Sequence, residues 1–83
     1  MEDISIIKME VEYPYIFAEF EDGIKKKYNV IDTLVPRREE YKKLLNREYF
    51  SKVKLSPMGW ALIWDNRIDT TSDDVYENGE IVE

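Results

Sequence analysis

Residues 15–30 read YIFAEFEDGIKKKYNV and decide the fold, because two β-rich runs flank Asp22-Gly23. Aromatic and β-branched residues favour strands, and an Asp-Gly pair between two such runs is typical of a β-hairpin. A shift of the strand register by one residue moves every side chain to the other face of the sheet. The length of the hairpin loop therefore determines which residues enter the core.

Two loop lengths are open for this hairpin. A two-residue turn places Phe20 opposite Lys25 and mixes apolar and charged residues on both faces. A three-residue loop, with Gly23 in the left-handed region, pairs Phe20 with Ile24 and Glu19 with Lys25. We predict the three-residue loop because it separates the two kinds of residue. The face that it makes apolar contains Ile16, Ala18, Phe20, Ile24, Tyr28 and Val30, with Lys26 as its charged member.

A further strand is predicted before the hairpin, over residues 4–11. Alternation places Ile7, Met9 and Val11 on one face of that strand. Pro14 has no N–H group to donate to a strand ladder, so it ends the strand.

A helical spacing follows the hairpin, over residues 32–50. The stripe expected to face the core consists of Tyr41, Leu44 and Leu45. Glu39 precedes Lys43 by four residues, which is the favourable orientation for an ion pair on a helix. Asn46 is predicted to end this helix and to cap a short helical turn over residues 47–51.

Two more short strands are predicted, over residues 53–55 and over WALIW, residues 60–64, with a turn at residues 57–59. The residues of the second strand that share a face are Trp60, Leu62 and Trp64. The predicted fold is a single domain over residues 1–83 of the α+β class. It has an antiparallel β-meander sheet of four to five strands, with one or two short helices packed on one face.

The run WDNRIDTTSDDVY, residues 64–76, concentrates carboxylates and amides and raises the question of a metal or catalytic site. Its acids lack the alternate spacing, central Gly and closing Glu of an EF-hand loop. Asp69 and Asp73 could act as acid and base only in a deep cleft that raises one pKa. Because the chain has no His and no Cys, the sequence predicts a protein that is not an enzyme, with no catalytic residue, no metal and no cofactor.

The same run is predicted to begin a short helix. Thr71 or Ser72 can accept the free N–H groups at the start of the helix, and Asp73 and Asp74 favour its positive end. Residues 78–79, Asn-Gly, are expected to end the helix through a left-handed residue. Each polar residue of the run then has a structural role.

The acidity of the chain is concentrated at one end. Residues 1–64 hold eleven Asp/Glu and eleven Lys/Arg, whereas residues 65–83 hold seven acids and Arg67 alone, so these residues carry the whole net charge of -6. Such a segment repels nucleic-acid phosphates and attracts a basic partner. Alternatively, it is a solvated polar end that keeps a small protein soluble. No apolar run approaches a membrane span, and the acidic amino terminus is unlike a signal peptide. We expect a cytoplasmic protein that neither associates with a membrane nor binds nucleic acid directly.

Aromatic side chains near the outer face of a strand can anchor a protein partner when they lie among charges, unless a helix covers them. The residues predicted to contact a partner are Tyr13, Tyr15, Phe17, Asp69, Asp73 and Asp74. The sequence thus predicts a non-catalytic protein-interaction module. The alternative is a regulatory or antitoxin-like partner of a neighbouring gene product, whose acidic end masks a basic surface.

Several motifs along the chain carry a family resemblance. They are Phe20-x-Asp22-Gly23, Tyr28-Asn29-Val30, Leu34, Glu48-Tyr49-Phe50, Val53-Lys54-Leu55, Leu62-x-Trp64-x-Asn66-x-Ile68-Asp69 and Asp74-Val75-Tyr76. Through them residues 15–76 resemble the bacterial domain of unknown function 2442 family. Arg67 stands where that family often has Gly, and Thr71-Ser72 where a Pro is common, so a different local turn is expected.

The resemblance implies an antiparallel sheet with one or two short helices, no cofactor and no established activity. Some members of the family carry an added helix-turn-helix DNA-binding domain, which this sequence lacks. Others are encoded beside another small uncharacterised protein, a pattern suggestive of toxin–antitoxin pairs. The resemblance therefore bears on the fold more than on the function.

Overall fold

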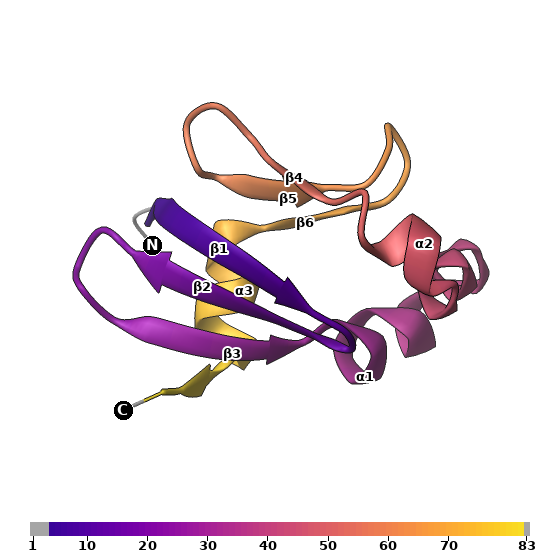
Figure 1. Ribbon diagram of the computed structural model, residues 1–83, viewed down its shortest axis with the longest axis horizontal. Helices are drawn as coiled ribbons and strands as arrows, with labels where there is room; N and C mark the ends of the chain where they lie inside the picture. The colour runs from indigo at the N-terminus through magenta and orange to yellow at the C-terminus, as the bar shows by residue number, and fades with distance from the viewer. Residues whose placement is uncertain (1–3, 83) are drawn as a thin grey trace.

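The computed structural model describes residues 4–82 and is of the α+β class (Figure 1). The strands are β1 (Ile6–Glu12), β2 (Tyr15–Phe20), β3 (Lys25–Asn29), β4 (Lys54–Leu55), β5 (Ala61–Ile63), β6 (Asp69–Thr71) and β7 (Glu80–Ile81). The α-helices are α1 (Val30–Leu34), α2 (Arg47–Phe50) and α3 (Ser72–Asn78), and the 3-10 helices are η1 (Val35–Arg37) and η2 (Glu39–Leu45).

The strands form two antiparallel sheets. One has the order β1-β2-β3-β7 and the other the order β4-β5-β6. The α+β class and an antiparallel sheet of four strands are confirmed. The strands after residue 50 pair with one another instead of extending the first sheet, and the chain returns to that sheet only at β7. Figure 1 shows α3 behind the four-stranded sheet, so one face of this sheet is covered by helix.

The hairpin of β2 and β3 has the predicted three-residue loop. The Phe20 amide donates to the Ile24 carbonyl at 2.9 Å, and the Gly23 amide donates to the Phe20 carbonyl at 2.9 Å. Gly23 has a φ of +88°, and Glu19 is paired with Lys25. The buried side chains that this register brings to one face are Ile16, Ala18, Phe20 and Tyr28.

Gly23 allows a test of this loop. Replacement of Gly23 by alanine should lower the free energy of unfolding by about 1–2 kcal/mol, because a Cβ disfavours the left-handed region. A Cβ at this position meets no atom within 4 Å, so the loss measures the backbone alone. Urea unfolding checks it, with Gly23→Asn as the control that should lose less, since Asn tolerates this conformation. Equal losses in the two variants would contradict the explanation.

Lys26 is the charged residue on the apolar face, and the structure shows how it is accommodated. Its ammonium lies 4.8 Å from the centroid of the Tyr76 ring and donates to the Gly79 carbonyl at 3.5 Å. A lysine stem can lie along apolar surface while its charge reaches a polar group. Lys26 therefore connects β3 to the end of α3 without an unpaired buried charge.

The start of β1 differs from the prediction. Ile6 and Lys8 are paired with consecutive residues of β2, so the intervening Ile7 is an extra residue, a β-bulge. Ile6 enters the core, whereas Ile7 is 58% exposed. Met9 packs against the core. The prediction that Ile7 shares the face of Met9 and Val11 is wrong, because a bulge resets the alternation of side chains.

The segment between β3 and β4 is helical, but it is divided into four short pieces. Over η2 the helix has the 3-10 form, with three residues per turn. Tyr41 and Leu44, three residues apart, are therefore buried together, while Leu45 is 50% exposed. The predicted stripe is correct for the first two residues and wrong for Leu45.

The same 3-10 winding changes an ion pair. Glu39 contacts Lys42, three residues on, at 3.1 Å, rather than the predicted Lys43. The helix cap is as predicted, because the side-chain oxygen of Asn46 accepts the amide of Tyr49 at 2.9 Å. The sequence thus predicts the local helix cap at Asn46, although it does not predict that η2 is a 3-10 helix.

Helix α3 begins as predicted and ends differently. The Thr71 hydroxyl oxygen accepts the Asp74 amide at 3.1 Å. Gly79 has a φ of -79°, so the predicted left-handed end is wrong. A Cβ on Gly79 would lie 2.7 Å from the Val75 carbonyl oxygen and 3.0 Å from the Lys26 Cβ. Glycine is required here because a side chain would meet the Val75 carbonyl of α3 itself and, next, the Lys26 side chain of β3.

One apolar cluster joins both sheets and the helices. Its largest fully buried members include Tyr28, Phe20, Phe50, Leu44 and Leu62. Leu62 in β5 and Trp64 just after it enter this core, whereas Trp60, which precedes the strand, is about half exposed. The Trp60 indole N–H donates to the Ser5 hydroxyl at 2.9 Å, which ties the turn before β5 to the start of β1.

Candidate functional site

The outer face of the four-stranded sheet, opposite α3, carries the aromatic residues predicted to meet a partner. Within residues 4–82 no helix lies over this face (Figure 1). Tyr15 and Phe17 alternate with the buried Ile16 and Ala18, so their side chains point away from the core. Both are half-buried by neighbours on the sheet. The Lys27 ammonium lies 4.6 Å from the centroid of the Tyr15 ring.

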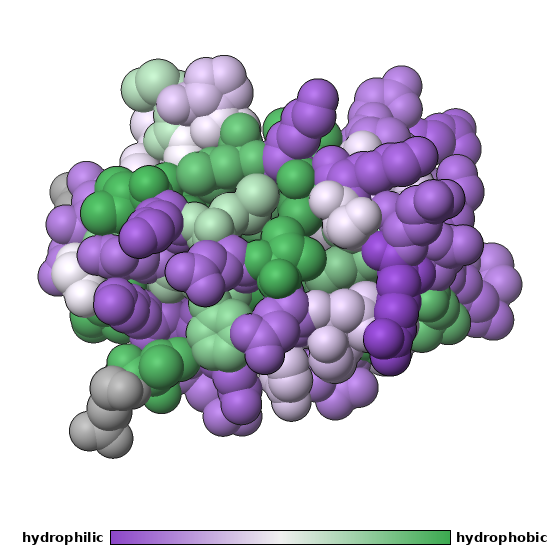
Figure 2. Space-filling model, in the orientation of Figure 1, coloured by the Kyte–Doolittle hydropathy of each residue, from purple (hydrophilic) through white to green (hydrophobic). Residues whose placement is uncertain are grey.

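Phe17 borders a shallow hollow of about 210 Å³ on this face. The hollow is lined by Lys8, Met9, Glu10, Phe17, Ala18, Glu19, Lys25 and Val82. Two lysines and two glutamates in this set balance each other, and Phe17 is its one aromatic ring. Figure 2, which views this face, shows hydrophobic residues gathered between hydrophilic ones. An apolar centre with a mixed-charge rim resembles the core and rim of a protein interface.

Tyr13 lies apart from this hollow. Its ring packs edge-on against Phe50, with centroids 4.9 Å apart, and the Arg47 guanidinium lies 4.7 Å from its centroid. Its hydroxyl donates to the Leu45 carbonyl at 3.2 Å. The structure therefore brings Tyr15 and Phe17 together and assigns Tyr13 to the packing of the helical segment.

The three predicted acidic residues occupy different environments. Asp69 is exposed on β6, and Asp73 is half-buried in the first turn of α3. Asp74, beside it, has a side chain that is only 16% exposed. Asp69 and Asp73 can meet a partner from solvent, whereas Asp74 is directed into the molecule.

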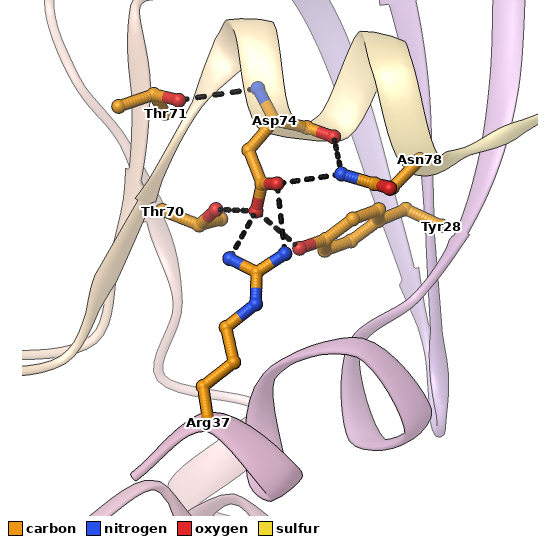
Figure 3. A network of polar contacts seen from close by, with 6 residues as sticks. All are labelled: Tyr28, Arg37, Thr70, Thr71, Asp74 and Asn78. Atoms are coloured by element: carbon orange, nitrogen blue, oxygen red, sulfur yellow. Dashed lines mark hydrogen bonds and ion pairs between the residues drawn. The ribbon is translucent and has the colours of Figure 1, made fainter.

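Asp74 is the centre of a polar network (Figure 3). Two guanidinium nitrogens of Arg37, in η1, donate to its carboxylate at 3.0 and 3.1 Å. The Tyr28 hydroxyl of β3 donates at 2.7 Å and the Thr70 hydroxyl of β6 at 2.6 Å. The Asn78 amide donates at 2.7 Å. One carboxylate thus joins both sheets to η1 and α3.

These contacts determine the protonation of the network. Partial burial by itself raises the pKa of Asp74, but the hydrogen bonds from Arg37, Thr70 and Tyr28 outweigh it and hold the pKa below its ordinary value. Burial, and then the hydrogen bond to Asp74, raise the pKa of the Tyr28 hydroxyl. At neutral pH Asp74 is therefore ionised and Tyr28 protonated, the state in which all these hydrogen bonds hold.

Asp65 has a structural role at the other end of the acidic run. One carboxylate oxygen accepts the amides of Arg67 and Ile68 at 2.8 and 3.0 Å. The other accepts the Tyr49 hydroxyl at 2.5 Å. The hydrogen bond from Tyr49 and those from the two amides lower the pKa of Asp65. Asp65 shapes the β5–β6 turn and ties it to α2.

Some residues of these sites carry no signal in the sequence alone. Lys8 and Glu10 border the hollow because the β-bulge sets their register against β2. Val82 reaches it by pairing beside β3, where its amide donates to the Lys25 carbonyl at 2.9 Å. Arg37 meets Asp74 across 37 positions of the chain. The alternation of β2 was the one local signal, and it identifies Phe17.

Comparisons give no relative to this chain: no protein-family model, no curated protein and no solved structure matches it. The resemblance of residues 15–76 to the domain of unknown function 2442 family stays a prediction from its motifs. No helix between residues 4 and 82 has the length and apolar character to cross a membrane. In the same part of the chain, no three acidic side chains are grouped as a metal ion requires.

Proposed function

We propose that this chain is a non-catalytic protein-interaction module whose contact surface is the outer face of the four-stranded sheet. The observation that carries the proposal is the hollow beside Phe17, on a face that no helix covers within residues 4–82. Its occupant is an apolar side chain of a protein partner. The lack of His and Cys in the sequence supports a role in binding rather than in chemistry.

The partner is expected to bear both signs of charge around that apolar side chain. Lys8 and Lys25 stand on the rim of the hollow with Glu10 and Glu19, so a uniformly basic or acidic partner gains little there. Buried aromatic contacts surrounded by a polar rim carry most of the binding energy in protein interfaces. We therefore expect Phe17 to contribute most to affinity.

A comparison of two variants tests this proposal. The wild-type chain, Phe17→Ala and Met58→Ala are each immobilised and exposed to a host extract, and the retained protein is purified and titrated by calorimetry. Met58 is 65% exposed in the turn between β4 and β5 and serves as the matched apolar control. The Phe17→Ala affinity should fall by about thirtyfold, while Met58→Ala stays near wild type. Equal affinities, or no retained protein, would exclude the proposed surface.

A second candidate function, a regulatory or antitoxin-like partner of a neighbouring gene product, is favoured by a separate surface. Asp69, Asp73 and Glu77 form no ion pair within residues 4–82, and the last two are four residues apart on α3. Such acids suit a basic partner. Co-expression should relieve toxicity of the neighbouring product, and Asp73→Lys with Glu77→Lys should abolish that relief. A neighbouring product that is harmless alone would refute this candidate.

A further inference from the structure

β1 is one of the two edge strands of the four-stranded sheet, and part of its backbone faces away from β2. The amide of Phe20 bonds across the hairpin to β3. Successive residues of a strand direct their N–H and C=O groups alternately to the two neighbouring strands. Phe17, an odd number of residues from Phe20, therefore directs these groups toward β1, where its paired residue is Glu10. The neighbours of Glu10, Met9 and Val11, therefore direct their N–H and C=O groups outward.

The outward edge of β1 is open beyond its first residue. The Ile6 amide donates to the Gly59 carbonyl at 2.7 Å, and past Ile6 no other backbone hydrogen bond within residues 4–82 reaches this edge. Ile7 is 58% exposed and Val11 39% exposed. An open edge with exposed apolar side chains is a template for pairing with another strand.

The charges of β1 are complementary to a second copy of the same strand. When two β1 strands run antiparallel with Met9 opposite Met9, each Lys8 faces Glu10 of the other copy, and symmetry repeats the pair. The adjacent registers oppose like charges at their centres, either Glu10 with Glu10 or Lys8 with Lys8. The register centred on Glu10 also brings each Lys8 opposite Glu12 of the other copy, so the charge of Glu12 distinguishes it from the register centred on Met9. Neither residue forms an ion pair in the described part of the chain, so both charges are available.

We infer that the chain forms a symmetric dimer through its β1 strands, in the register centred on Met9. The two four-stranded sheets then become one continuous antiparallel sheet, with the outer faces of both copies on the same side. The hollows of the two copies, each bordered by Lys8 and Glu10, lie on either side of the two-fold axis. This inference goes beyond the proposed function and does not depend on it.

A charge-reversal experiment tests the register. Sedimentation equilibrium is measured over micromolar to millimolar concentrations for the wild type, Lys8→Glu, Glu10→Lys and an equimolar mixture of these two variants. Each variant alone opposes like charges twice, so its dimer should be weakened about tenfold or more. In the mixture, the two glutamates of one chain face the two lysines of the other, and dimerisation should return to near the wild-type level.

Two controls make the outcome decisive. Glu12→Lys should leave dimerisation unchanged, because in this register Glu12 faces no charged residue and lies opposite Ile6, whose amide is already bonded to Gly59. Phe17→Ala should leave dimerisation unchanged even where partner binding is lost. Hydrogen exchange at the Met9 amide should slow as the protein concentration rises. A wild type that stays monomeric, a mixture that dimerises no better than its components, or a Glu12→Lys variant that is monomeric would overturn the inference. Thermal unfolding confirms that each variant is folded.

Discussion

Replacement of Phe50 by alanine is expected to lower the free energy of unfolding by about 3–5 kcal/mol. The Phe50 ring is fully buried and makes edge-on contacts with Tyr13 and Trp64, at centroid distances of 4.9 and 6.1 Å. It joins α2 to the β1–β2 turn and to the residue that follows β5. Because the ring packs between two segments distant in sequence, the surroundings cannot easily collapse into the space that it leaves, and the full cavity cost is expected.

Leu45 supplies the matched control for Phe50. It is a large apolar residue of the same helical segment but is 50% exposed, so Leu45→Ala should change stability by less than about 0.5 kcal/mol. Urea unfolding followed by tryptophan fluorescence and by circular dichroism measures both variants. A loss below about 1 kcal/mol for Phe50→Ala would show that the segment repacks, contrary to the expectation.

The second large effect is expected at Asp74. Asp74→Ala should cost about 2–4 kcal/mol, because it leaves the hydroxyls of Tyr28 and Thr70 without their acceptor and removes the partner of Arg37. The donors to Asp74 come from both sheets and η1, so no single element can restore them. Asp74→Asn keeps the shape but points an amide N–H toward donors, and it should lose an intermediate amount. An Asp74→Ala variant with the same free energy of unfolding as the wild type would show that the network does not stabilise the fold.

The pH dependence of this loss separates charge from shape. The folded-state pKa of Asp74 lies below its ordinary value of 3.8, so its ionised contribution is complete above that value. The contribution disappears as the pH falls through the lower, folded-state pKa. The stability difference between wild type and Asp74→Asn should therefore be constant from pH 7 to pH 5 and shrink below about pH 4. A difference independent of pH would indicate that the carboxylate charge contributes nothing.

The features of this fold that sequence predicts are those with local causes. The Asp22-Gly23 loop, the Asn46 cap and the Thr71 cap each depend on contacts within four residues, and the sequence predicts all three. Predictions that needed a helix type or a distant neighbour went wrong. Leu45 is exposed because η2 has three residues per turn, and Gly79 is needed because a side chain would meet both the Val75 carbonyl and Lys26 of β3.

The candidate site divides in the same way. Alternation along β2 identifies Phe17 as an outward residue. The hollow beside Phe17 also needs the β1 register, and that register depends on a bulge at Ile7 with no mark in the sequence. The spacing of the acidic run predicts structural roles for its residues, and the carboxylates of Asp65 and Asp74 have such roles. The partner of Asp74, Arg37, is distant in sequence, so only the folded chain reveals it.

The attachment of β7 to the rest of the protein has a consequence for local opening. β7 is held by the pairs Lys26–Ile81 and Lys27–Glu80, whereas Asp74 anchors α3 to segments on three sides. Detachment of β7 therefore breaks few contacts and is a low-energy fluctuation. Release of α3, in contrast, breaks the hydrogen bonds of Asp74 to η1 and to both sheets at once. The helix α3, η1 and the two sheets should therefore unfold together as one cooperative unit.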